Sequence, residues 1–321
     1  MFSLRKTPPA HPRSWERKST TPAPGAGPGA RLYRVAKLVG RELANTFLLV
    51  VGVTGLLFLL FNAMPGEFPG KGEGLSAFLF LLHGLLTFDF GISVVSGMDI
   101  NSLVFPAFWN TLLLTAGAMT LTLVVAVPIG VFSAFRGFKG YSWPLTILSY
   151  IISSIPVFYF GYLVLYLVSR YTGFLPVYYP RGGLEQREVL AYLLPILVLG
   201  LSNDALSEIV RLISSELGRV MRTDYVVAAR ARGQYMLESA STEGIFIPLV
   251  SIVFSKVPFL IGGAVIVEHV FSWPGMGRLA FQSTLNRDMP VLVVIAFLSV
   301  LLVRAGMIAR ELVLSQLRSG A

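Results

Sequence analysis

The sequence contains no cysteine and little charge. Among its 321 residues there are no Cys and only three His, and charged residues make up 13% of the chain. Without cysteine the chain has no disulfides, no thiolate metal ligands and no cysteine nucleophile. Soluble domains carry roughly 25% charged residues, so this chain has about half the charge that a water-facing surface needs. The composition therefore excludes an ordinary soluble globular protein.

Long apolar stretches occupy most of the chain. Hydrophobic residues make up 54% of it, and the mean hydropathy is +0.70. Several stretches reach the length of about 20 residues that crosses a bilayer as a helix. They predict an all-α polytopic membrane protein with about six transmembrane helices. We expect these spans at about residues 43–64, 110–135, 144–169, 190–213, 247–270 and 291–311.

Two segments outside these spans have a different character. Residues 1–30 are rich in Pro, Gly, Ser and Thr, which predicts a disordered cytoplasmic tail ahead of a transmembrane domain at 31–321. This tail lacks the apolar core of a signal peptide. The stretch LSAFLFLLHGLL at 75–86 is apolar but too short to span, so we expect a helix that lies in the membrane interface.

Basic residues are distributed unevenly between the two predicted sides. With the N-terminus inside, the inner segments hold roughly three times as many Lys and Arg residues as the outer ones, as the positive-inside rule requires. We therefore expect both termini in the cytoplasm. The net charge of +9 follows from this topology, and we expect no nucleic-acid partner.

One long polar stretch, at about 214–246, lies on the predicted inner side between the fourth and fifth spans. Within it, VAARARG favours a helix, and Gly233 then ends or bends that helix. Small side chains permit close approach by another protein, and arginines can meet acidic partners. A helix resting on anionic lipid is the alternative. The candidate docking residues are Asp224, Tyr225, Ala228, Ala229, Arg230, Ala231, Arg232 and Gly233.

A second candidate site lies where the fifth span ends on the outer side. Glu268 follows the apolar run LIGGAVIV, and Pro274-Gly275 predicts a turn. We expect Trp273 in the aromatic belt at the membrane interface. The segment is either a structural elbow or part of an outer gate that contacts another protein. Its candidate residues are Glu268, Phe271, Trp273, Pro274, Gly275 and Gly277.

Charged side chains within the predicted spans form a third candidate. Asp204 and Glu208 are four residues apart on one helix face, and Lys256 lies in the fifth span. Charges in a bilayer are costly unless they are paired or wet. The acids either pair with Lys256 or Arg211, or line a pathway for a cationic substrate. Gly262 and Gly263 permit close helix packing and are candidate pathway residues as well.

Sequence motifs then indicate a family. Asp224-Tyr225-Val226 followed by Ala229-Arg230-Ala231-Arg232-Gly233 resembles the loop that couples permease subunits of ABC importers to their ATPases, in the form typical of the dipeptide, oligopeptide and nickel branch. Further elements resemble that branch in its order. They are Met64-Pro65-Gly66-Glu67, Asp89-Phe90-Gly91-Ile92-Ser93, Ser154-Ile155-Pro156-Val157-Phe158, Gly173-Phe174-Leu175-Pro176 and the run from Gly262 to Gly277.

The resemblance implies a transport subunit of the prokaryotic inner membrane that forms half of a pathway for peptides, nickel chelates or related small solutes. It implies a second related permease subunit, two ATPase subunits and an extracytoplasmic solute-binding protein as partners. ATP and Mg²⁺ are then expected on the ATPases, with no cofactor or metal bound by this chain. The sequence agrees, since it has no Walker A loop and no nucleophile–base constellation.

Two other classes of protein fit the composition. An ion-coupled secondary transporter would use Asp204, Glu208 and Lys256 as coupling groups and would work without an ATPase. A non-transporting membrane scaffold would tolerate loss of the helix at 224–240.

Overall fold

The structure is a computed structural model that describes residues 28–63, 74–136, 142–177, 186–202, 204–233 and 245–320. The chain divides into two compact units, Met1–Arg41 and Glu42–Ala321. The predicted tail at 1–30 lies outside the described residues except for its last three, which belong to the first helix. The loop element from Met64 to Glu67 also lies outside them.

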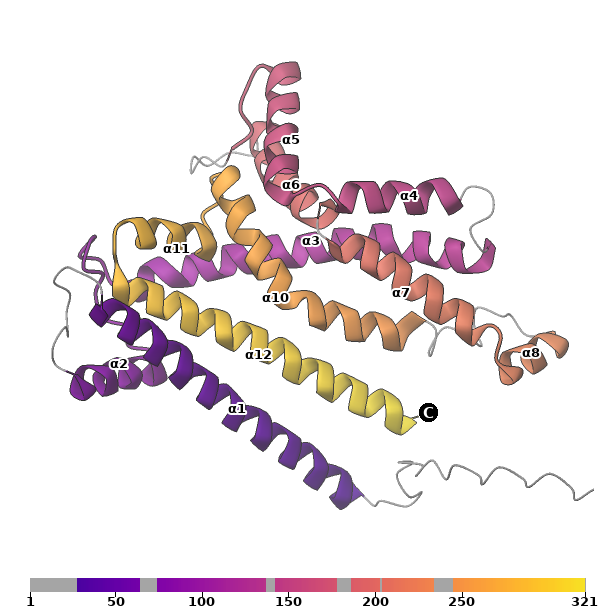
Figure 1. Cartoon of the computed structure of the whole chain (residues 1–321), viewed down its shortest axis with the longest axis horizontal. Helices are drawn as coiled ribbons and strands as arrows, with labels where there is room; N and C mark the ends of the chain where they lie inside the picture. Colours follow the sequence, from indigo (N-terminus) through magenta and orange to yellow (C-terminus); the bar gives the residue numbers. More distant parts are fainter. Residues whose placement is uncertain are drawn as a thin grey trace, which may run out of the picture. The chain divides into compact units, whose positions relative to one another are not determined.

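Helices account for nearly all of the described chain (Figure 1). Those residues contain no strand, only an isolated bridge between Ile92 and Asp99. The helices are α1 (Pro28–Ala63), α2 (Leu75–Thr87), α3 (Ile100–Arg136), α4 (Ser142–Ser153), α5 (Val157–Thr172), α6 (Gln186–Leu201), α7 (Asp204–Val220), α8 (Asp224–Ala231), α10 (Ile247–Val270), α11 (Met276–Leu285) and α12 (Met289–Gly320).

Among the residues that the structure describes, three helices are long and apolar enough to cross a membrane by themselves. The apolar segments are Val39–Ala63 in α1, Ile100–Phe135 in α3 and Met289–Ser315 in α12. The count rises to five if each of two bent helix pairs is one span. The all-helical, multi-pass prediction is confirmed. A sixth span would need α10, whose 24 residues reach about 36 Å at 1.5 Å per residue.

The third and fourth predicted spans are each broken into two helices. The third consists of α4 and α5, which meet at 99° around Pro156. A proline pushes the residue before it out of the helical region and offers no N–H, so the helix ends there and a new one starts. The fourth consists of α6 and α7, bent by 52°. Because α7 runs on to Val220, the polar loop begins later than residue 214.

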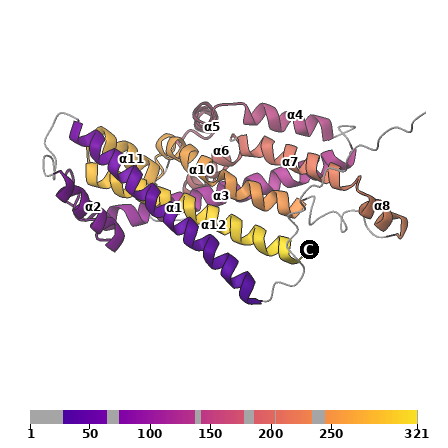
Figure 2. The same cartoon turned by 60° about the horizontal axis from the view of Figure 1, so that its bottom comes forward.

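Helix α3 packs against most of the other helices in the unit Glu42–Ala321, including α4, α6, α7, α10, α11 and α12 (Figure 2). It contributes to three of the apolar clusters around it, one of which contains Ile100, Val104 and Ala107. Leu114 and Ala118 join a cluster with α5, α6 and α10, and Ala126 joins one with α7. Helix α3 remains continuous through Pro106 and Pro128. A break therefore depends on the position of a proline and not only on its presence.

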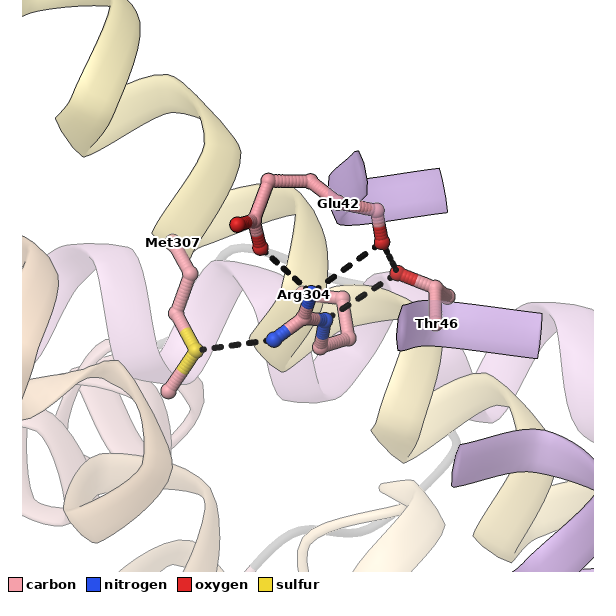
Figure 3. A network of polar contacts seen from close by, with 4 residues as sticks. All are labelled: Glu42, Thr46, Arg304 and Met307. Atoms are coloured by element: carbon pink, nitrogen blue, oxygen red, sulfur yellow. Dashed lines mark hydrogen bonds and ion pairs between the residues drawn. The ribbon is translucent and has the colours of Figure 1, made fainter. Parts of the chain in front are cut away.

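A buried polar network joins α1 to α12 (Figure 3). The guanidinium of Arg304 pairs with the Glu42 carboxylate at 2.5 Å and donates to the Thr46 hydroxyl at 3.0 Å. Its Nη1 also approaches the Met307 sulfur at 3.7 Å. The paired side chains are only 11% and 13% exposed. Arg304 lies within α12 and not in an inner loop.

Candidate coupling helix and outer elbow

The predicted docking helix is present as α8, a separate eight-residue helix that follows α7 after a short turn. Asp224 lies in its first turn, where a carboxylate interacts favourably with the helix dipole. Gly233 has a φ of +79°, a left-handed conformation that favours glycine and ends the segment. The helix and its glycine stop were therefore predicted correctly.

Helix α8 has one face that packs against the protein and one face that is exposed. Val226 is buried and packs with Leu217 and Val220 at the end of α7. Ala229 is also buried, at 4% exposed, so the expectation that it permits approach by a partner was wrong. It lies three residues after Val226 and therefore on the same helix face.

The exposed face of α8 carries the remaining candidate docking residues. The exposed side chains are those of Asp224, Tyr225, Val227, Ala228, Ala231 and Arg232. The side chain of Arg230 lies outside the described residues. The exposed face thus combines small residues, two larger apolar residues and charges of both signs. None of the described helices covers it.

The outer elbow is built around Glu268, which is completely buried near the end of α10. Its carboxyl group accepts a hydrogen bond from the Thr111 hydroxyl at 2.7 Å and one from the Arg278 backbone N–H at 2.9 Å. Thr111 in turn accepts from the Met276 N–H at 2.8 Å. One carboxyl group therefore connects α3, α10 and α11, and it satisfies polar groups that would otherwise be buried without partners.

Trp273 occupies the interior of the elbow and not an aromatic belt, so that expectation was wrong. It is 1% exposed, and its indole N–H donates to the Asn110 carbonyl at 3.1 Å. Tyr192 packs edge-on against it, with ring centroids 5.3 Å apart. Phe271 is fully buried in the same apolar cluster. The indole finds its hydrogen-bond partner within the protein, so the ring does not need the interface.

Two glycines permit the close packing of the elbow. A Cβ on Gly275 would overlap the Glu268 carboxyl group, and a Cβ on Gly277 would lie 2.5 Å from the Cα of Val265. The turn between these helices is closed by the Asn110 side-chain amide, which donates to the Pro274 carbonyl at 2.9 Å. By contrast, Gly262 is exposed and a Cβ there would meet nothing within 4 Å.

The segment before α3 contacts the turn between α11 and α12. The Ser93 hydroxyl, from the Asp-Phe-Gly-x-Ser element, donates to the carboxylate of Asp288. Both side chains are buried. The Asn101 amide also donates to the Phe88 carbonyl at 2.9 Å, which fixes the turn before α3. The loops at 88–99 and 286–288 thus form one connected surface.

The charged residues of the broken fourth span are brought together. Lys256 forms an ion pair with Asp204 at 3.1 Å and another with Glu208. The lysine side chain is 5% exposed, while the Asp204 and Glu208 side chains are 59% and 38% exposed. The prediction that the acids pair with Lys256 is confirmed, and Arg211 is not the partner. Two carboxylates with one lysine leave an excess of negative charge at the bend.

Several residues of these sites were missed from the sequence. Thr111 and Arg278 in the elbow, Asp288 in the outer surface and the Glu42–Arg304 pair were not selected. Thr111 carried the one usable signal, a hydroxyl directly after Asn110 at the start of an apolar span. The Arg278 contact is made by a backbone N–H, which no residue type predicts.

Comparison with known proteins identifies the class. The family described as "Binding-protein-dependent transport system inner membrane component" matches residues 126–319. The oligopeptide transport system permease protein AppB of Bacillus subtilis is 28% identical over 306 residues, covering 85% of this chain and 95% of that protein. The metal-staphylopine import system permease protein CntB of Staphylococcus aureus is 26% identical, covering 74% of this chain and 75% of that protein.

Two further similarities agree. The nickel import system permease protein NikB of Staphylococcus aureus is 27% identical over 66% of this chain and 62% of that protein. A structure of the inward-facing MetNI methionine ABC transporter matches with a TM-score of 0.54 and 18% identity, covering 67% of this chain and 96% of that one, and shows the same fold.

The fold and these similarities define a multi-pass inner-membrane permease subunit of an ABC importer. The chain belongs to the binding-protein-dependent transport system inner membrane component family. Family membership removes the secondary-transporter and scaffold alternatives.

Proposed function

We propose that this chain forms half of a translocation pathway with a second, related permease subunit. Two ATPase subunits bind ATP and Mg²⁺, hydrolyse the ATP and dock on the exposed face of α8. The observation that carries this proposal is the division of α8 into a face packed on α7 and a face that the described helices leave open. Movement of α8 with the ATPases would bias the two states of the pathway.

We propose cytoplasmic positions for both termini. The network of Glu42 and Arg304 supports this, because it brings the start of the first span beside the end of the last. The two ends would then lie on one side of the membrane, as the six spans expected from the sequence require. The basic loops assign that side to the cytoplasm.

The proposed substrates are peptides or small chelated solutes, delivered by a solute-binding protein to the outer loops. Relatives named for oligopeptide, nickel and metal-staphylopine transport support this range. The connected surface around Ser93 and Asp288 is the proposed contact for the binding protein.

The excess negative charge at the bend between α6 and α7 favours passage of cationic substrates. We expect the double substitution Asp204→Asn with Glu208→Gln to slow uptake of a basic peptide by at least roughly tenfold, a loss of about 1.4 kcal/mol, and to spare a neutral peptide. Uptake assays in cells, corrected for the amount of protein, measure both. Equal rates for the variant and the parent with the two peptides would remove the pathway role.

Isolation of the tagged chain from membranes in mild detergent tests the assembly. The proposal predicts that a second permease and one or two ATPases are recovered with it. Variants on the exposed face of α8, such as Ala228→Trp, should then lose the ATPases and keep the permease. Recovery of the chain alone, with transport in liposomes that lack ATP, would contradict the proposal.

A further inference from the structure

A cavity of about 790 Å³ lies between α3, α4 and α7. Three arginines contribute to its lining: Arg211 and Arg219 on α7, and Arg222 in the turn that follows. Figure 1 draws these three helices near one another, and their contacts agree. The cavity is separate from the elbow and from the acidic bend.

The arginine lining follows from the two faces of α7. Arg211 and Gly218 are seven residues apart and share one face of α7, and Arg222 follows in the turn after that helix. The opposite face is apolar and buried against α3 and other helices, with Ile209, Ile213 and Leu217 at 0% exposed. Folding of the apolar face therefore turns the basic face toward the cavity.

The positive charge of the cavity is only partly balanced by the described residues. Glu216 pairs with Arg219 at 2.8 Å. Within the described part of the chain, Arg211 and Arg222 form no ion pair. Cations next to a membrane need water or an anion close by.

A second observation points to a ligand. The Ser133 hydroxyl lines the same cavity, is 1% exposed and has no hydrogen-bond partner among the described residues. Buried polar groups in folded proteins are nearly always satisfied. Ser214 and Tyr150 add two further hydroxyl groups to the lining. The lining thus offers several hydrogen-bond donors around two guanidinium groups, which suits the oxygens of a phosphate.

We propose that this cavity binds the phosphate group of an anionic phospholipid from the inner leaflet. The neighbouring surface of α4 favours a lipid over a free ion, because the exposed Trp143 shares the helix face of the lining residues Thr146 and Tyr150. Acyl chains can lie there while the headgroup enters the cavity. Basic pockets between transmembrane helices on the cytoplasmic side bind anionic headgroups in this way.

The glycine at position 218 allows a steric test. A Cβ there would meet nothing within 4 Å, and the residue lines the cavity. Gly218→Leu should therefore fold and fill the space without changing any charge. The double substitution Arg211→Gln with Arg222→Gln removes the charge and leaves the space. Arg170→Gln, in the last turn of α5, is the matched control for charge.

Native mass spectrometry of the detergent-purified chain, with its co-purifying subunits, measures lipid binding. After delipidation the parent should retain phosphatidylglycerol over phosphatidylcholine by roughly tenfold or more, since each arginine strengthens anionic lipid binding. Both cavity variants should lose that preference, and Arg170→Gln should keep it. Equal binding of the two lipids, or an unchanged preference in Gly218→Leu, would overturn the proposal.

Two further arms separate the other ligands. Inorganic phosphate at millimolar concentration should leave phosphatidylglycerol bound, and its displacement would assign the cavity to a free anion. If the arginine variant lost its ATPases while retaining the lipid preference, the arginines would serve protein docking and the lipid site would be refuted.

Discussion

The outer elbow and α8 lie in the same unit of the chain and are constructed in opposite ways. In the elbow, Glu268 and Trp273 are buried and every polar group described for them has a partner. In α8, one turn of apolar side chains holds the helix to α7, and the other face is exposed. A densely packed region is suited to keep its shape while other parts move. A lightly attached helix with an open face is suited to bind and to follow a partner.

The largest expected effect comes from the closest contact in the elbow. Gly277→Ala places a Cβ against the Val265 backbone, which cannot rotate away as a side chain can. We expect α10 and α11 to separate, at a cost of about 3 kcal/mol, the upper end of typical overpacking. The thermal unfolding of the purified chain in detergent measures this loss.

Gly262→Ala is the control for that change. It is also a helical glycine, but its Cβ has open space in this chain, so helix propensity should leave stability unchanged or raise it by about 0.5–1 kcal/mol. If the two variants unfolded at the same temperature, close packing would not be what holds the elbow.

A smaller effect is expected from the hydrogen-bond network. Thr111→Val keeps the side-chain shape but removes the partner of both the Glu268 carboxyl group and the Met276 N–H. Leaving the Met276 N–H and one oxygen of the Glu268 carboxyl group unpaired should cost about 1–3 kcal/mol. The same melting experiment applies.

Thr120→Val, on the same helix, provides the comparison. Its hydroxyl is exposed and donates only to the Ala116 carbonyl in its own helix, so we expect a change within about 0.5 kcal/mol. An equal loss of stability in both variants would show that the loss does not depend on the hydrogen bonds of the elbow.

The smallest effect on stability is expected from a substitution on the exposed face of α8. Ala228→Trp adds bulk to an exposed position and should change the free energy of unfolding by less than about 0.5 kcal/mol. It should nevertheless reduce ATP-dependent uptake and ATPase recovery by roughly tenfold, equivalent to about 1.4 kcal/mol of docking free energy.

Val226→Ala separates the two faces of α8. This side chain is fully buried against α7, so its truncation should cost about 1–3 kcal/mol of stability. The exposed docking face stays intact, and the protein that folds should retain its ATPases. A stable Val226→Ala variant, or an unstable Ala228→Trp variant, would reverse the assignment of the faces.

Patterns within single segments were predicted well. The length of the apolar stretches predicted a membrane protein. The Ala-rich composition predicted the helix α8, and Gly233 predicted where it ends. Lys256 was one of the two partners predicted for the acidic pair, because a bilayer leaves few other options for charges.

Features that depend on distant contacts were not predicted. Hydropathy does not distinguish Pro156, which separates two helices at 99°, from Pro128, which lies inside a continuous one. The burial of Trp273 depends on Asn110 and Tyr192, which come from other helices. Glu42 and Arg304 come from the two ends of the transmembrane domain, and nothing local pairs them.

Hydrogen–deuterium exchange of the purified chain, with and without its ATPase subunits, tests the coupling role of α8 most directly. The account predicts that amides of α8 exchange quickly in the chain alone and slow markedly when the ATPases bind, while those around Glu268 and Trp273 stay protected in both states. Unchanged exchange in α8, with protection gained elsewhere on the cytoplasmic side, would contradict it.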